Sequence, residues 1–201
     1  MASASPGSRL MSTVVDGPTG PAEAPWLLLP DGTGVVELAS ACGLPLWPQP
    51  DPIGAHTFAL GQVLQAAATH PEVDRVVVAL GGSASTDGGT GALTALGAQF
   101  LLANGDRMPW GASGLGSLSR VDLSALVPPP AGGVEILSDV DATLLGPLGA
   151  ARQFGPQKGA APADVAALEA GLAHLAEILG GDPDQAGAGA AGGTAYGLAT
   201  L

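Results

Sequence analysis

The sequence predicts an α/β fold, with a mixed or parallel sheet and flanking helices. An unbroken β-branched run from Val76 to Leu80 is typical of a strand that is covered on both faces. Apolar residues spaced three and four apart between Thr57 and Thr69 predict a helix before it, and Ala92 to Leu96 begins another after a glycine-rich loop. This order of helix, strand, loop and helix favours parallel strands joined by helices.

Shorter elements are expected before this helix, strand, loop and helix. Met11 to Val15 has the composition of a short strand. Trp26 to Leu29 is an apolar run that indicates a second strand, and it ends in the turn-forming residues Pro30 to Gly34. Val35 to Ala41 then has apolar spacing that fits a short helix. The N-terminal part is therefore predicted as strand, strand, turn and helix.

After the centre, Phe100 to Leu102 precedes a stretch rich in Pro, Gly and Ser, residues 104–119, which predicts a long surface excursion. Val134 to Leu137 is a further strand candidate. The clearest helix is Pro162 to Leu179, with Pro in its first turn and two glycines beyond its end. We expect three regions: a flexible N-terminus over residues 1–11, a central lobe over 12–181, and a glycine-rich loop with the start of a helix over 182–201.

Charge and cysteine content limit the possible partners. Eighteen acidic and six basic side chains give a net charge of -12, which repels nucleic acids and anionic membrane surfaces, so we expect neither as a partner. A small anion can still bind, because backbone N–H groups attract anions locally. The single cysteine, Cys42, cannot form an internal disulfide, and the sequence has no signal peptide and no apolar run of membrane-spanning length. We expect a cytoplasmic protein.

The glycine-rich loop after the Val76 strand is the first candidate site. Glycines permit tight turns and let backbone N–H groups approach an anion, and the hydroxyl groups of Ser83, Ser85 and Thr86 can hydrogen-bond phosphate or sugar oxygens. Asp87 can be an N-cap, a magnesium ligand or a proton acceptor, and the sequence leaves these roles open. An ordinary strand-to-helix turn is the alternative. The loop is neither a Walker motif nor GxGxxG, which argues against a dinucleotide-dependent oxidoreductase.

A second candidate site follows the strand that ends at Leu137. Asp139 places a carboxylate at the carboxyl end of that strand, where open α/β sheets bind ligands. Lys158 is the only lysine of the chain, and its charge can offset phosphate charge during phosphoryl transfer. A solvent-exposed surface lysine is the alternative.

These motifs, in this order, resemble the bacterial glycerate kinase family. The family pattern runs GGSATNDGG, ALGARFLDADG, CDVxNPLxG and FGPQKGA, and this chain has GGSASTDGG, ALGAQFLLANG, SDVDATLLG and FGPQKGA. The resemblance extends from about Val14 to Leu201 and includes GAGAAGG near the end. It implies a glycerate-kinase-like fold of two α/β lobes that bind D-glycerate and ATP with Mg²⁺ between them. The product in most bacterial members is 2-phosphoglycerate.

The resemblance also implies site residues. We expect Asp87, Lys158 and Asp139 to be catalytic, with Asp139 holding Mg²⁺ through the phosphates. The residues expected to bind substrate or phosphate are those that match the family's loops, Gly81, Gly82, Ser83, Gly88, Gly89, Gln157 and Gly159. Ser85 and Thr86 are added to them because of their hydroxyl groups and not because of the resemblance.

Several positions depart from the family pattern. Ala142 and Thr143 replace Asn-Pro, Thr86 replaces the Asn of SATND, and residues 56–62 read HTFALGQ in place of TTxGTGE. The family's PDSFKGS, ADGGEGT and TGEGxxDxQTxxGK segments have no counterpart, so the second lobe is expected to be largely missing. Phosphoryl transfer needs several elements at once. We therefore expect this chain alone to be inactive or weakly active, with a separate chain as one source of the missing lobe. A non-catalytic anion- or nucleotide-binding module is the alternative.

Overall fold

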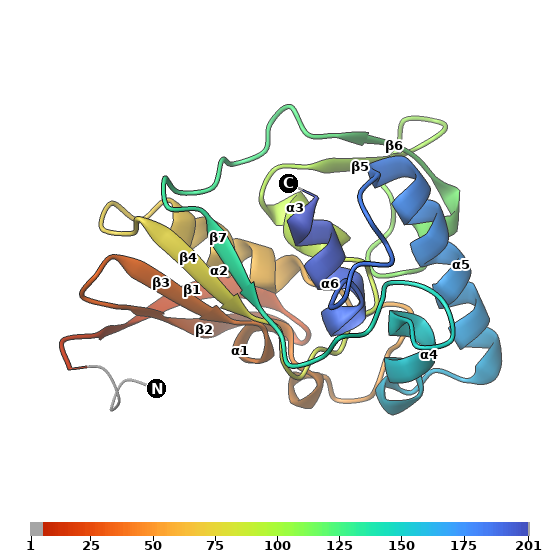
Figure 1. Ribbon diagram of the computed structural model, residues 1–201, viewed down its shortest axis with the longest axis horizontal. Coiled ribbons are helices and arrows are strands. Elements are labelled where there is room, and N and C mark those ends of the chain that lie inside the picture. The colour runs from red at the N-terminus through yellow and green to blue at the C-terminus, as the bar shows by residue number, and fades with distance from the viewer. Residues whose placement is uncertain (1–5, 201) are drawn as a thin grey trace.

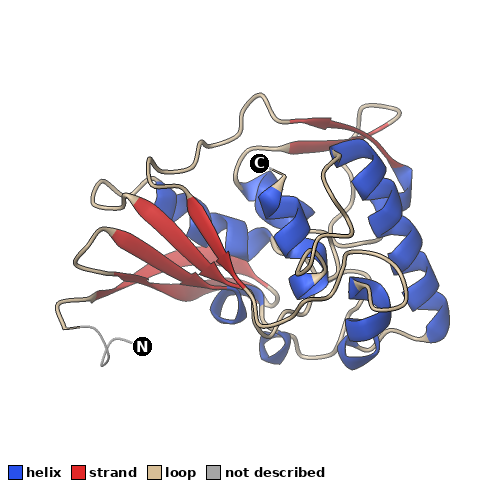
Figure 2. Cartoon of the chain, in the orientation of Figure 1, coloured by secondary structure: helices blue, strands red, loops and turns tan. Residues whose placement is uncertain are grey.

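A five-stranded mixed sheet forms one side of the molecule, and the helices α4, α5 and α6 lie on the other (Figures 1 and 2). The computed structural model describes residues 6–200. The strand order is β1-β2-β3-β4-β7, in which β1, β2 and β3 are antiparallel and β3, β4 and β7 are parallel. The strands are β1 (Arg9–Gly17), β2 (Gly20–Leu28), β3 (Thr33–Glu37), β4 (Arg75–Ala79) and β7 (Val134–Leu137).

Strand β4 is the central parallel strand that the sequence predicts. Val76 and Val78 are fully buried on one of its faces, and the strand is paired along both edges. Ala79 at its end lies opposite Leu137 at the end of β7, and the Leu80 amide donates to the Leu137 carbonyl at 2.9 Å. The loops that follow β4 and β7 therefore leave the sheet side by side.

The helices pack around the end of the central strand. Helix α2 (Phe58–Ala68) lies against α3 (Thr90–Ala95) so closely that a Cβ at Gly61 would be 2.3 Å from the Ala92 carbonyl oxygen. Helix α5 has the bounds that the sequence predicts, Pro162–Leu179, and buries Leu168, Leu172 and Leu175. The other elements are α1 (Leu38–Cys42), α4 (Ala150–Phe154), α6 (Ala190–Ala199), the pair β5 (Gln99–Leu102) and β6 (Leu118–Asp122), and the 3₁₀ turns η2 (Leu44–Leu46), η3 (Leu115–Ser117) and η4 (Pro156–Lys158).

The structure differs from the sequence predictions at two element boundaries and in the burial of one segment. Val35 and Val36 belong to β3, so the helix predicted for Val35 to Ala41 begins only at Leu38, because β-branched residues gain more from pairing with β4 than from a short helix. Strand β1 begins at Arg9, within the expected flexible N-terminus; residues 1–5 lie outside the described part. Leu115, inside the expected surface excursion, is fully buried and anchors that segment to the core.

The last helix begins before Tyr196, where the sequence indicates it. Helix α6 starts at Ala190, and its first turn contains three residues with left-handed backbone angles. Between residues 6 and 200, no helix is both long and apolar enough to cross a lipid bilayer.

Candidate functional site

The loops after β4 and β7 meet at a pocket of about 390 Å³. Because these strands are parallel neighbours, their carboxyl ends open on the same edge of the sheet, where α/β proteins bind ligands. Residues of α4 and η4 also line the pocket. Its walls contain six of the residues that the sequence predicts for the site: Gly81, Gly82, Ser83, Asp139, Gln157 and Lys158. The other lining residues are Leu44, Pro45, Leu80, Val140, Phe154 and Ala191.

Lys158 is a buried residue of this wall, with 2% of its surface exposed. Its Nζ donates a hydrogen bond to the Ser85 carbonyl oxygen, which ties the second motif to the glycine-rich loop. Burial lowers the pKa of the Lys158 ammonium from 10.5 to about 8, and the charge of Asp87 opposes that shift. The alternative of a solvent-exposed surface lysine is therefore wrong.

Only the first part of the glycine-rich loop faces the pocket. Gly81 and Gly82 are exposed and Ser83 lies at the edge, whereas Ser85 and Thr86 are fully buried. The Ser83 hydroxyl lies 3.3 Å from the Ser85 hydroxyl and accepts a hydrogen bond from the Ser85 amide at 3.2 Å. Ser85 and Thr86 do not line the pocket, so their burial favours a role in shaping the loop over direct contact with a substrate.

Gly88 and Gly89 continue the loop into the interior. Both have positive φ angles, 63° and 79°. A Cβ at Gly88 would lie 2.3 Å from Leu175 of α5, and one at Gly89 would lie 3.2 Å from the Thr194 carbonyl oxygen of α6. The absence of side chains there lets the loop pack between two helices. Gly159, also with a positive φ of 93°, packs against Pro50 and is outside the pocket wall.

Asp87 is fully buried, and its carboxylate is saturated with hydrogen bonds. Oδ2 accepts from the Thr57 amide at 2.9 Å, the Thr57 hydroxyl at 2.8 Å and the Gly91 amide at 3.1 Å. Oδ1 accepts from the Gly89 amide at 3.2 Å. Asp87 does not line the pocket, and Gly89 occupies the N-cap position of α3. The bonds of Asp87 to the Gly89 and Gly91 amides and to Thr57 hold the start of α3 against the start of α2.

Comparison with known proteins supplies a family for this chain. The sequence pattern of the family described as "Glycerate kinase family" matches residues 1–201. The chain belongs to the glycerate kinase family. It is 38% identical over 177 residues to a glycerate kinase of Haemophilus influenzae, covering 84% of this chain and 47% of that protein. It is also 38% identical over 193 residues to a glycerate 2-kinase of Escherichia coli, covering 89% of this chain and 49% of that protein.

A solved structure shares the fold. The crystal structure of a glycerate kinase 2 from Salmonella typhimurium superimposes with a TM-score of 0.93 at 34% identity, and the match covers 100% of this chain but 56% of that one. The glycerate-kinase-like α/β fold predicted from the motifs is therefore confirmed. The chain spans about half the length of the curated relatives it matches.

Two parts of this candidate site were missed by sequence reasoning. Thr57 looks like an ordinary residue before a helix, and only its contacts reveal that it holds Asp87. The segment Ala191–Gly193 has three consecutive left-handed residues, and Ala191 is the only non-glycine residue with positive φ in the described chain. The run of glycines in GAGAAGG was the available sign, because glycine tolerates this backbone.

The Ala191–Gly193 segment is pressed against the glycine-rich loop. The Gly88 amide donates to the Gly192 carbonyl oxygen at 3.1 Å. A Cβ on Gly192 would lie 2.2 Å from the Ser85 carbonyl oxygen and 3.0 Å from the Lys158 Nζ. Ala191 itself lines the pocket. The wall of the pocket is thus built by five segments of the chain, at residues 44–45, 80–83, 139–140, 154–158 and 191.

Asp139 supplies the carboxylate that faces the pocket. It is exposed, in a turn in which the Val140 amide donates to the Ser138 hydroxyl at 3.2 Å. Within residues 6–200 no group of three or more His, Cys, Asp or Glu side chains is arranged to hold a metal ion. One carboxylate nevertheless fits Mg²⁺, which usually takes one or two protein carboxylates and completes its shell with phosphates and water.

Proposed function

We propose that this pocket is part of a glycerate kinase site, which transfers the γ-phosphoryl group of ATP to D-glycerate and yields 2-phosphoglycerate and ADP. The observation that carries the proposal is the position of the Lys158 ammonium in one pocket wall with Gly81 to Ser83 and Asp139. Phosphoryl transfer needs a cation and oriented N–H donors around the phosphate oxygens. The family membership gives this chemistry its substrates.

The proposed role of Lys158 is to stabilise charge on the transferred group. A pKa of about 8 leaves the ammonium mostly charged at pH 7. Because the side chain is buried and bonded to the Ser85 carbonyl, its position is fixed before a ligand arrives. Gly81 and Gly82 are exposed and line the same wall as Ser83, and we propose that their backbone amides and the Ser83 hydroxyl donate to phosphate oxygens.

Asp139 is proposed to hold Mg²⁺ together with the phosphates of ATP. Bound Mg²⁺ would neutralise part of the phosphate charge. Gln157, exposed on the pocket rim beside Lys158, is proposed to contact the substrate through its side-chain amide. Asp87, Gly88, Gly89 and Gly159 are proposed to position these groups without touching the substrate, because they pack outside the pocket wall.

The family's activity belongs to proteins about twice as long as this chain. We propose that the 201 residues alone are weakly active or inactive, and that full activity needs the remaining half, as continuous polypeptide or as a separate chain. The same length difference favours a second candidate function, an anion- or nucleotide-binding module without turnover. We propose that the protein works in the cytoplasm, because a single, buried cysteine suits a reducing compartment.

Calorimetry and a coupled assay together test this function. The chain is titrated with MgATP and with D-glycerate, and ADP formation is measured beside the Escherichia coli relative. We expect MgATP binding, with turnover at least about a hundredfold below the relative. Asp139→Asn should weaken MgATP binding but not Mg²⁺-free phosphate binding, with Asp184→Asn as the exposed control. Binding of MgATP or D-glycerate without any ADP formation would support the non-catalytic binding module. A rate of ADP formation equal to that of the Escherichia coli relative would refute the proposed weak activity. If neither ligand binds, both proposed functions are refuted.

A further inference from the structure

A separate hollow of about 290 Å³ lies where the segment after β5 returns to helix α3. Its walls are formed by Thr90 and Thr94 of α3, Phe100 of β5 and the loop residues Arg107 to Trp110. The Met108 amide donates to the Phe100 carbonyl at 2.8 Å, so the loop is fastened to β5. The hollow shares no lining residue with the pocket of the proposed glycerate kinase site. A ligand bound here would be additional to the substrates proposed above.

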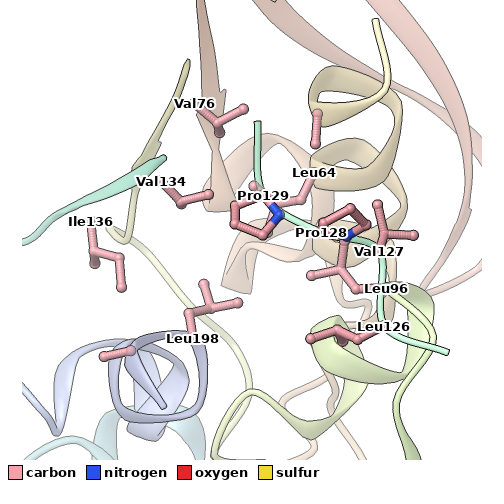
Figure 3. Close-up of a pocket in the computed structure, with 12 residues that line it drawn as sticks. Leu64, Val76, Leu96, Leu126, Val127, Pro128, Pro129, Val134, Ile136 and Leu198 are labelled. Carbon is pink, nitrogen blue, oxygen red and sulfur yellow. The ribbon is translucent and has the colours of Figure 1, made fainter. Parts of the chain in front are cut away.

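This hollow differs in its chemistry from the larger one that Figure 3 shows between β7, α2 and the end of α6. The larger hollow, of about 380 Å³, is lined by aliphatic residues alone, such as Val134 and Leu198. Its side chains offer no hydrogen-bond donor or acceptor, so they cannot select a polar ligand. The smaller hollow combines a tryptophan ring, a cation and two hydroxyl groups, and small-molecule sites use this mixture of apolar surface with a few polar groups.

The ring of Trp110 is fixed by the protein and is still 47% exposed. Its centroid lies 4.7 Å from that of the Phe58 ring and 5.1 Å from that of the His56 ring. The backbone beside it is anchored as well, because the Ala112 amide donates to the Ile53 carbonyl at 2.8 Å. A fixed aromatic ring with nearly half of its surface free is a good stacking platform, since little conformational entropy is lost when a planar ligand packs on it.

Arg107 is the only charged residue that lines the hollow, and it is exposed. The other four arginines are each paired with a carboxylate, at N···O distances of 2.6 to 3.9 Å, whereas Arg107 has no acidic partner within residues 6–200. The neighbouring Asp106 accepts instead from the Asn104 side-chain amide at 2.7 Å. In a chain with 18 acidic side chains, an unpaired guanidinium in the same hollow as a free aromatic ring favours an anionic ligand.

The two threonines on the α3 wall are left as hydrogen-bond acceptors for a ligand. The Thr90 hydroxyl donates to the Asp87 carbonyl at 2.9 Å, and the Thr94 hydroxyl donates to the Thr90 carbonyl at 2.8 Å. Each hydroxyl has a single hydrogen, so the lone pairs of its oxygen remain for an N–H or O–H donor. Thr94 is the more accessible of the two. The hollow therefore provides a stacking surface, a cation and acceptors.

We propose that this hollow binds a small planar ring that carries an anionic group and an N–H donor, with the ring packed on Trp110 and the anion at Arg107. A mononucleotide such as AMP and an aromatic acid such as 4-aminobenzoate share this chemistry. The volume of about 290 Å³ lies at the lower end of the range for small-molecule sites, which suits ligands of this size. The inference goes beyond the proposed function and does not depend on it.

Calorimetry of the 201-residue chain without Mg²⁺ tests the site with these two probes. We expect at least one of them to bind, and Arg107→Gln and Trp110→Leu each to weaken that binding by at least about tenfold. Binding of AMP alone supports the inference with a nucleotide as ligand, and binding of 4-aminobenzoate alone supports it with an aromatic acid. The matched control is Arg120→Gln, at an exposed arginine that does not line the hollow, which should bind as the parent does.

Tryptophan fluorescence gives a readout of the stacking itself. A ring packed on Trp110 should quench its emission in the parent protein, and this quenching should be absent from Trp110→Phe although Trp26 and Trp47 remain. Trp110→Phe keeps an aromatic ring and should therefore lose less affinity than Trp110→Leu. If circular dichroism shows that Trp110→Leu does not fold, Arg107→Gln and Trp110→Phe carry the test.

Lys158→Met separates this site from the proposed active site. AMP binding that persists in Lys158→Met and weakens in Arg107→Gln supports the inference, whether or not the chain has kinase activity. AMP binding that is lost in Lys158→Met but unchanged in Arg107→Gln would assign AMP to the active-site pocket; this would overturn the inference while the proposed function stands. Absence of binding of both probes, or binding that neither Arg107→Gln nor Trp110→Leu changes, would overturn it as well.

Discussion

The Lys158 ammonium donates a hydrogen bond to the carbonyl oxygen of Ser85, a residue that lies 73 positions earlier in the chain. This bond joins the two motifs on which the family assignment depends. It also removes one donor of the only lysine from the solvent and aligns the side chain with the pocket wall. The Ser85 carbonyl therefore fixes the position of the charged Lys158 side chain in the pocket wall.

We expect Lys158→Met to weaken the binding of MgATP by at least about tenfold, because it removes a charge-assisted donor from the pocket while keeping an apolar stem of similar length. Calorimetry measures the loss. The matched control is Arg120→Met, at an exposed cation that does not line the pocket, which should bind as the parent does. Equal MgATP affinities of the parent and Lys158→Met would show that Lys158 does not contribute to ligand binding.

Ligand binding should depend on pH through the same residue. The pKa of the folded-state ammonium is about 8, so the charge is present below pH 8 and is lost as the pH rises through that value. Phosphate affinity should therefore decline above pH 8, well below the ordinary lysine pKa of 10.5. Calorimetry from pH 6.5 to 9.5 checks this, and a flat profile in the parent protein would contradict it.

The same pKa difference predicts how stability changes with pH. Between pH 8 and 10.5 the unfolded chain keeps a proton on Lys158 that the folded chain has lost, so this group makes the free energy of unfolding rise with pH over that window. Lys158→Met should remove this contribution. Urea unfolding at a series of pH values measures the slope for both proteins, and identical slopes would count against a buried, shifted lysine.

Asp87→Ala should lower the free energy of unfolding by about 3–5 kcal/mol, because it leaves a buried cluster of N–H and O–H donors without an acceptor. Thr57→Val should cost less, since it removes a single hydroxyl. Asp184→Asn, at an exposed carboxylate, is the control and should change little. If Asp87→Ala folds with full stability but cannot bind MgATP, the Asp87 side chain contributes to ligand binding and does not stabilise the loop.

The left-handed segment at the start of α6 gives two opposite expectations. Ala191→Gly should be neutral or raise stability by up to about 1 kcal/mol, because glycine accepts a φ of 53° without strain. Gly192→Ala should lower stability by more than about 2 kcal/mol, because its Cβ would lie 2.2 Å from the Ser85 carbonyl oxygen. Thermal and urea unfolding of the pair provide the comparison; similar effects of both changes would mean that the segment is not held against the loop.

Local sequence patterns were sufficient for the long elements. The β-branched run of β4 and the stripe of leucines in α5 identify strand and helix without reference to the rest of the chain, since each period is intrinsic to its backbone. The patterns predicted the wrong element at Val35 and Val36, because a short apolar run fits the period of a helix as well as that of a strand. There the pairing partner, β4, decides, and it lies about forty residues further along the chain.

The sequence by itself determined the family, the central strand with its glycine-rich loop, and the two motifs that contribute to one pocket. Only the tertiary structure decided which of their residues line the pocket: Lys158 does so from a buried position, whereas Asp87 is turned inward and bonded to Thr57. The physical reason is that motif spacing depends on the chain alone. Burial, hydrogen-bond saturation and the pKa of Lys158 depend instead on segments that meet only after folding.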